Sequence, residues 1–152
     1  MAILDIRKAG DPVLKQKAAP VEKITKKIKE LIESMTETMY AADGVGLAAP
    51  QIGVSQRIIV IDVGDGLIGL VNPVIVEHEG LECATEGCLS IPGVFGDVER
   101  ASRVTVKALD RNGKSVRIVA DGLLARALQH EIDHLEGVLF IERSNTIYKG
   151  NK

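Results

Sequence analysis

The chain has 152 residues, a length that one compact domain accounts for, and we expect a single domain over residues 1–152. A formal net charge of −2 gives no general attraction to nucleic acid or to anionic membranes, so neither is an expected partner. The N-terminus lacks an apolar secretory signal, no window approaches the roughly 20 apolar residues of a membrane span, and two cysteines are too few for a disulfide framework. We therefore expect a cytoplasmic protein.

A helical pattern of apolar residues runs through the first third of the chain. Spacings of three and four predict an amphipathic helix over residues 21–42, which the Asp43-Gly44 pair then ends. The next ten residues, 44–53, contain three glycines and a proline. We expect an irregular loop there, with a backbone that another group approaches closely. The apolar stripe of the helix consists of Ile24, Ile28, Leu31, Ile32, Met35 and Met39.

The rest of the chain combines short strands with a second helix. Runs rich in β-branched residues between positions 57 and 120, separated by turn signals, predict antiparallel strands. Asp121 is placed to cap a helix over residues 122–136, which Gly137 ends. We therefore expect an α+β fold in which antiparallel sheets pack around this C-terminal helix, with the amphipathic helix near the N-terminus.

The second helix carries the pattern HExxH. Residues four apart lie on one face of a helix, so His130 and His134 can bind one metal ion. Glu131 is rotated by about 100° from His130, close enough to act on a water molecule as a general base without being a ligand. The spacing therefore predicts a hydrolytic metal centre.

Two histidines leave a catalytic site one protein ligand short. The extended metalloprotease pattern would place a third histidine at position 140, where the chain has Phe140, and only Glu136 and Glu142 could supply a downstream glutamate. Both cysteines are candidates on sequence alone. We favour Cys88, in a glycine-containing turn between two strands, and expect Cys83 to be a small buried packing residue.

Three segments of the chain together resemble the motifs of a known family. In order and spacing, residues 44–51 (GVGLAAPQ), 86–90 (EGCLS) and 130–134 (HEIDH) look like the three signature motifs of bacterial peptide deformylases. The similarity extends over nearly the whole chain. It implies removal of the formyl group from the N-terminal formylmethionine of newly made proteins. It also implies one divalent metal ion held by Cys88, His130 and His134, most often Fe²⁺, with Zn²⁺, Ni²⁺ or Co²⁺ as alternatives.

The resemblance also assigns roles in the reaction. A metal-bound hydroxide would attack the formyl carbon, with Glu131 as general acid and base. The side-chain amide of Gln51 and the backbone N–H of Leu89 would stabilise the developing oxyanion. Gln51 could at the same time stabilise its own loop.

Several residues are expected to bind the substrate. An extended peptide could pair with the backbone at Val45 and Gly46. Leu123 and Ala127 share a helix face with His130 and could line a methionine pocket, although Leu123 could equally be ordinary core. Glu86 could close this pocket or accept local backbone hydrogen bonds. The residues expected to contact substrate are thus Val45, Gly46, Glu86, Gly87, Leu123 and Ala127.

Two further expectations concern the surroundings of the site. Asp133 is expected to orient an arginine, either Arg100 or Arg103. Many relatives continue into a basic C-terminal helix for which ribosome contact has been proposed, whereas residues 142–152 here are a short polar tail, so at most a transient ribosome contact is expected. Two alternative functions are an amidase that acts on another acyl group and a metal-binding regulator. A regulator would have no need of an acid–base carboxylate at the position of Glu131.

Overall fold

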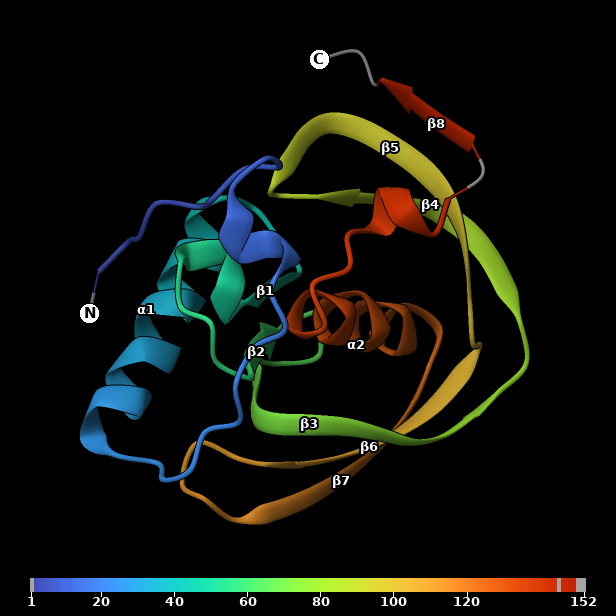
Figure 1. The fold of residues 1–152 in the computed structure, drawn as a ribbon. Helices are drawn as coiled ribbons and strands as arrows, with labels where there is room; N and C mark the ends of the chain where they lie inside the picture. Colours follow the sequence, from blue (N-terminus) through green and yellow to red (C-terminus); the bar gives the residue numbers. More distant parts are fainter. Residues whose placement is uncertain (1, 145, 150–152) are drawn as a thin grey trace.

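The computed structural model describes residues 2–144 and 146–149, and it forms two α-helices and eight strands within them (Figure 1). The helices are α1 (Lys26–Ala41) and α2 (Gly122–Leu135). Short 3₁₀ helices are η1 (Pro12–Lys15), η2 (Ala49–Ile52) and η3 (Phe140–Glu142). The strands are β1 (Gly46–Ala48), β2 (Ile58–Ile61), β3 (Ile68–Glu79), β4 (Glu82–Cys88), β5 (Ile91–Arg100), β6 (Arg103–Leu109), β7 (Ser115–Asp121) and β8 (Thr146–Lys149).

The strands form two antiparallel sheets around a central helix. One sheet has the order β1-β2-β3-β6-β7 and the other the order β4-β5-β8, and all of their strand pairs are antiparallel. Figure 1 shows α2 in the middle of the molecule, with the curved strands around it and α1 to one side. The predicted α+β class and the helix at the centre of the sheets are confirmed.

Strand β2 is buried on both faces, which explains its unbroken apolar sequence. Its side chains alternate between the two faces of the sheet. Ile59 and Ile61 belong to the apolar cluster that contains Leu128 of α2, whereas Ile58 and Val60 belong to the cluster beneath α1. The five-stranded sheet is thus packed between the two helices at this strand.

Helix α1 begins five residues later than the sequence pattern predicts. Thr25 is its N-cap and accepts a hydrogen bond from the backbone N–H of Ile28 at 3.3 Å. Upstream, Val21 is held by Asn72, whose side chain accepts from its N–H and donates to its carbonyl, both at 2.8 Å. Because these hydrogen bonds tie the Val21 backbone to strand β3, residues 21–25 do not join the helix.

Residues 44–53 are more regular than expected. They contain strand β1, which pairs with β2 in the register Gly46 to Ile61, and the one-turn helix η2. The expectation of a wholly irregular loop is therefore wrong. Gly53, with φ of 84°, provides the left-handed residue that ends η2.

Helix α2 has the predicted limits to within one residue. Asp121 occupies the N-cap position, but its side chain makes no capping bond and lies 3.6 Å from Arg103 instead. At the other end, Gly137 has φ of 76°, and a Cβ there would lie 2.6 Å from the carbonyl oxygen of Lys15. Glycine is required at this position both for the backbone conformation and for the packing against the N-terminal segment.

Strand β4 contains both cysteines on opposite faces. Residues 83, 85 and 87 are exposed, whereas Glu86 is buried and Cys88 is partly buried. The expectation that Cys83 is a buried packing residue is therefore wrong, because strand alternation turns it outward.

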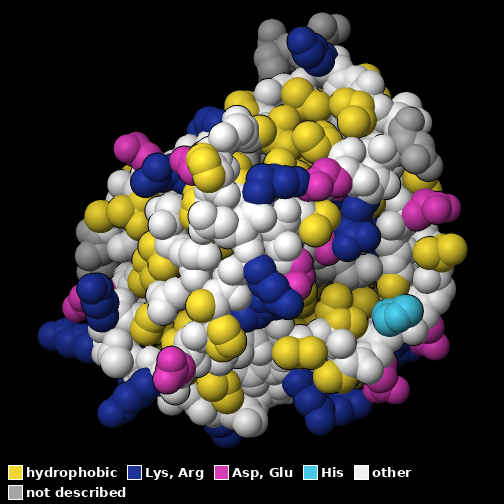
Figure 2. Space-filling model, viewed as in Figure 1, with side chains coloured by type: hydrophobic (Ala, Val, Ile, Leu, Met, Phe, Trp, Pro, Cys, Tyr) yellow, Lys and Arg dark blue, Asp and Glu magenta, His cyan; other side chains and the backbone are white. Residues whose placement is uncertain are grey.

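The surface carries both signs of charge. Figure 2 shows lysine and arginine side chains interspersed with acidic ones on one face of the molecule. Among residues 2–144 and 146–149, no helix is long and apolar enough to cross a membrane.

Candidate metal centre

One cluster brings together a thiol and two imidazoles. The Sγ of Cys88 and a ring nitrogen of each of His130 and His134 lie within 4.8 Å of one another. Cys88 ends β4, while the histidines lie one turn apart on α2, so two elements from distant parts of the chain supply the donors. The Sγ of Cys88 is 3.3 Å from Nε2 of His134.

Phe140 has a packing role beside this cluster. Its side chain is buried, and its ring stacks on that of His130 with centroids 6.1 Å apart. Phe140 stands where the extended protease pattern would have its third histidine, and its ring packs against the imidazole of His130.

The donor set fits a divalent transition-metal ion. Two imidazoles and one thiolate are three ligands of the types that such ions prefer, and three protein ligands leave a position for water or substrate. Burial and the charge of His130 lower the pKa of His134 well below its usual 6.5, which keeps that ring neutral as a ligand must be. Burial lowers the pKa of His130, but hydrogen bonds to Cys88 and Glu86 outweigh this effect and raise it to about 10. A metal ion bound at Nε2 of His130 would therefore displace a proton.

Glu86 orients His130 from behind. Its Oε1 lies 2.9 Å from Nδ1 of His130, so that Nδ1 is the donor and Nε2 is left for a metal. The same carboxylate accepts two bonds of 2.8 Å from Arg100 and one of 2.6 Å from Arg126. Burial opposes ionisation of Glu86, yet the hydrogen bonds and charges of Arg100 and His130 hold its pKa far below the usual range. The hydrogen-bond partners of this carboxylate among the described residues are side chains. The alternative that Glu86 accepts local backbone hydrogen bonds is therefore wrong.

Asp133 pairs with Arg100, one of the two arginines expected. Its Oδ2 accepts from Arg100 at 2.5 Å, and both of its oxygens accept from Arg143. Arg103 pairs with Asp121 instead. Arg100 therefore links Glu86 on β4 to Asp133 on α2, one residue before His134.

Glu131 faces the pocket from a buried position. Glu131 is only 4% exposed, and its Oε1 has no hydrogen-bond partner among the described residues. A Cβ on Gly46 would lie 2.5 Å from its Oε2, so β1 can pass the carboxylate only because position 46 is glycine. Burial raises the pKa of Glu131 to about 7, with the charge of His130 acting in the opposite direction.

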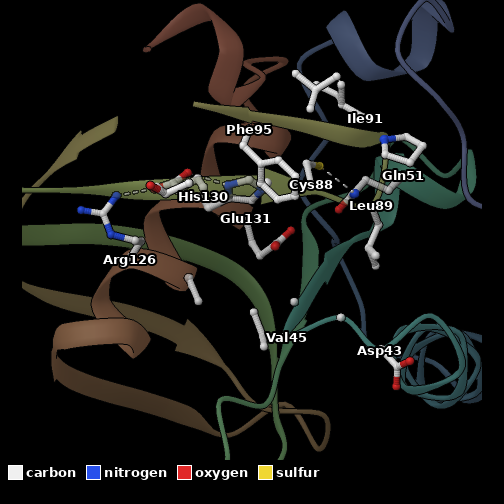
Figure 3. A pocket seen from close by; sticks show the side chains of 18 of the residues that line it. Asp43, Val45, Gln51, Cys88, Leu89, Ile91, Phe95, Arg126, His130 and Glu131 are labelled. Atoms are coloured by element: carbon white, nitrogen blue, oxygen red, sulfur yellow. Dashed lines mark hydrogen bonds and ion pairs between the residues drawn. The ribbon is translucent and has the colours of Figure 1, made fainter. Parts of the chain in front are cut away.

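Gln51 joins η2 to the turn that follows Cys88. Its Oε1 accepts from the backbone N–H of Ala48 at 2.9 Å, and its Nε2 donates to Ser90 at 3.1 Å and to the Sγ of Cys88 at 3.5 Å. The amide thus holds the loop together and also points an N–H toward the cluster. Leu89 lies in the same turn, on the wall of the adjoining pocket (Figure 3).

A pocket of about 480 Å³ opens beside these groups. Figure 3 shows Val45 on one side of it, with His130, Glu131 and Cys88 opposite. The remaining residues expected to bind substrate also line it, namely Gly46, Glu86, Gly87, Leu123 and Ala127. Leu123 is 55% exposed, so the alternative that it is ordinary core is wrong.

Sequence comparison assigns the chain to one family. The family model described as Polypeptide deformylase matches residues 3–149. The chain belongs to the polypeptide deformylase family. A peptide deformylase of Halothermothrix orenii is 64% identical over 145 residues, which are 94% of each chain. One of Carboxydothermus hydrogenoformans is 58% identical over 149 residues, which are 98% of each chain.

Solved structures of polypeptide deformylases have the same fold. The crystal structure of peptide deformylase from Thermotoga maritima has a TM-score of 0.94 and 49% identity, and the match covers 95% of this chain and 99% of that one. A peptide deformylase from Synechococcus elongatus in complex with actinonin has a TM-score of 0.93 and 50% identity, with 96% of this chain and 81% of that one covered.

Phe95 and Arg126 are among the residues of this deformylase pocket that the sequence did not predict. Phe95 packs its ring against the backbone of Gly87, where a Cβ would lie 3.0 Å from the ring. Arg126 lines the pocket and is buried. The available signal was a charged residue within the apolar run LLARAL of the second helix, which is unusual unless the charge is paired.

Proposed function

We propose that this chain is a metal-dependent peptide deformylase, which removes the formyl group from the N-terminal formylmethionine of newly made proteins. The observation that carries the proposal is the buried carboxylate of Glu131 beside a three-donor cluster at a pocket of about 480 Å³. A regulatory metal site would need neither the carboxylate nor the pocket.

Cys88, His130 and His134 would hold the metal, and we propose Fe²⁺ as the working ion, with Zn²⁺, Ni²⁺ and Co²⁺ able to bind. When bound, such an ion polarises the oxygen atoms that it coordinates and makes a water molecule easier to deprotonate. Glu86 would keep the proton of His130 on Nδ1, and the hydrogen bond from Gln51 to Cys88 would stabilise the thiolate.

Glu131 would act as the general base and then as the general acid. It takes a proton from the attacking water as the new C–O bond forms at the formyl carbon. It then passes this proton to the nitrogen as the C–N bond breaks, which releases formate and the free N-terminal amine. Burial of the carboxylate raises its pKa, which favours a group that can hold a proton and return it.

Gln51 and Leu89 would stabilise the charge that develops on the formyl oxygen. The Nε2 of Gln51 is already directed at the cluster, and the backbone N–H of Leu89 follows Cys88 directly. Fixed donors of this kind reduce the barrier because they need not reorganise during the reaction.

The substrate would enter as an extended peptide. Val45 and Gly46 lie at the outer edge of the five-stranded sheet, where β1 pairs with β2 on one side only, so the other edge can pair with a peptide backbone. Leu123 and Ala127 would contact the methionine side chain, and Gly87 also lines the pocket. Transient contact with the ribosome remains a prediction.

The decisive assay compares three forms of one methionyl tripeptide: formylated, acetylated and with a free amine. We expect turnover of the formyl peptide alone, and equal turnover of the acetyl peptide would favour a broader amidase. Glu131→Gln should lose about 10²- to 10⁴-fold in kcat while it keeps its metal content, which elemental analysis of the same sample measures. Retained activity in this variant would refute the assigned role of Glu131.

A further inference from the structure

Arg126 forms a three-point link between the histidine-bearing helix and the hairpin that carries Cys88. It lies on α2 one turn before His130, and its side chain is 9% exposed. Its guanidinium donates to Oε2 of Glu86 at 2.6 Å (Figure 3). It also donates to two backbone carbonyls, those of Glu82 at 2.6 Å and Val98 at 2.9 Å. All three acceptors belong to β4 or β5.

These bonds fix the hairpin at several places at once. Glu82 begins β4, Glu86 lies two residues before Cys88, and Val98 lies on β5 opposite Ala84. A planar guanidinium satisfies several acceptors in one fixed geometry, which the single ammonium group of lysine cannot do. The position of β4 relative to α2 therefore depends on this one side chain more than on an ordinary apolar contact.

The link leads directly to the metal-binding cluster. Cys88 approaches the histidines only because the end of β4 lies against α2, where its Sγ is 3.3 Å from His134. The carboxylate that Arg126 contacts is also the one that orients His130, through the other oxygen. Loss of Arg126 would thus loosen the positions of the Cys88 thiol and the His130 imidazole relative to the His134 imidazole.

We propose that Arg126 is a positioning residue that holds Cys88 and the two histidines preorganised for the metal ion. It does so without touching the metal or the substrate's reacting atoms. The inference rests on the proposed function of the cluster as a metal site. It predicts that replacement of Arg126 weakens metal binding by more than the accompanying loss of fold stability explains.

Arg57 offers a matched control. It too donates to two backbone carbonyls, of Ala18 at 3.3 Å and Leu135 at 3.2 Å, and pairs with a carboxylate, that of Glu136. It therefore links α2 to the N-terminal segment with the same kinds of bond, but among the described residues it makes no hydrogen bond or ion pair with β4 or β5. Arg57→Met should destabilise the fold and leave the cluster in place.

The experiment measures Co²⁺ binding to metal-stripped protein for the wild type, Arg126→Met, Arg126→Lys and Arg57→Met. The readouts are the Kd, the visible spectrum of the bound Co²⁺, which depends on its ligand geometry, and the rise in Tm that Co²⁺ causes. We expect Arg126→Met to raise the Kd by about 10- to 100-fold and to reduce the Co²⁺-induced rise in Tm. Arg126→Lys should fall between it and the wild type, and it provides the comparison if Arg126→Met does not fold. Arg57→Met should bind Co²⁺ like the wild type despite a lower Tm without metal.

Each failure has a separate meaning. Wild-type affinity and an unchanged spectrum in the Arg126 variants would overturn the inference and leave Arg126 as a structural residue. Equal loss of affinity in Arg57→Met would overturn it as well, since affinity would then follow global stability. If the wild-type protein itself binds no Co²⁺, the proposed metal site fails first.

Discussion

Replacement of Gly46 by alanine tests how closely β1 must approach the carboxylate of Glu131. The backbone at Gly46 is not left-handed, so alanine causes no conformational strain there. The effect comes from the added methyl group alone, which would lie 2.5 Å from Oε2 of Glu131 and 3.0 Å from its Cδ and Cγ.

The size of the effect follows from these distances. Ordinary van der Waals contact begins at 3.4 Å, so the carboxylate or the strand must move by about 0.9 Å. A displacement near 1 Å of a catalytic group costs about 10²-fold in rate, and we expect kcat for a formyl-methionyl tripeptide to fall by that factor. Overpacking of this kind also reduces the free energy of unfolding by about 1–3 kcal/mol. The metal content should stay at the wild-type level, because the atoms nearest to the added methyl group belong to Glu131 and not to a proposed ligand.

Gly69→Ala is the matched control, since Gly69 also lies in a strand of the same sheet with no left-handed backbone. A Cβ there would meet a methyl group of Ile32 at 3.2 Å, under α1 and outside the pocket. It should cost stability without loss of kcat. A Gly46→Ala enzyme with wild-type kcat and full metal content would refute the reasoning, because the position of Glu131 would then not limit the reaction.

Three further predictions follow from the same structure. Cys88→Ala should lose bound Co²⁺ and activity, whereas Cys83→Ala, on the exposed face of β4, should keep both; the reverse result in metal analysis would overturn the choice of ligand. Gln51→Glu replaces the Nε2 donor by an acceptor, and kcat should fall by about 10²- to 10³-fold with little change in KM; an unchanged kcat would remove Gln51 from the proposed oxyanion site. The hydrogen bond from the Leu139 N–H and the pairing with Lys15 lower the pKa of Glu142, so its contribution to stability is present above pH 4.5 and is lost as the pH falls through its folded-state value. Thermal unfolding of Glu142→Gln should therefore show a lower Tm at pH 7 and a smaller further loss on acidification; a Tm that depends on pH as in the wild type would contradict this.

Features determined by neighbouring residues were predictable from the sequence. The apolar spacing and the flanking Asp121 and Gly137 gave the limits of α2, and the i, i+4 spacing placed His130 and His134 together. Helical geometry alone decides both. The β-branched runs likewise predicted antiparallel strands, since strand alternation is also a local property.

Features that depend on distant residues were not predictable in the same way. Strand β1 has only three residues and exists because β2 pairs with it. The late start of α1 depends on Asn72, which lies 51 residues after Val21. The interactions of Glu86 with Arg100 and Arg126 likewise join three segments, and no spacing rule relates them. The order of residues in a chain does not reveal which buried charges will meet.

The central position of α2 has a consequence for how the protein folds. In the chain, this helix follows strands β1 to β7, yet its Leu128 and Leu135 complete the apolar cluster to which β1, β2, β3, β6 and β7 contribute. The strands therefore cannot bury their inner faces while the protein is being synthesised until the helix has emerged, and early chains should expose unpaired apolar surface. An enzyme proposed to act on nascent chains would thus itself need its own synthesis to pass α2 before it can fold.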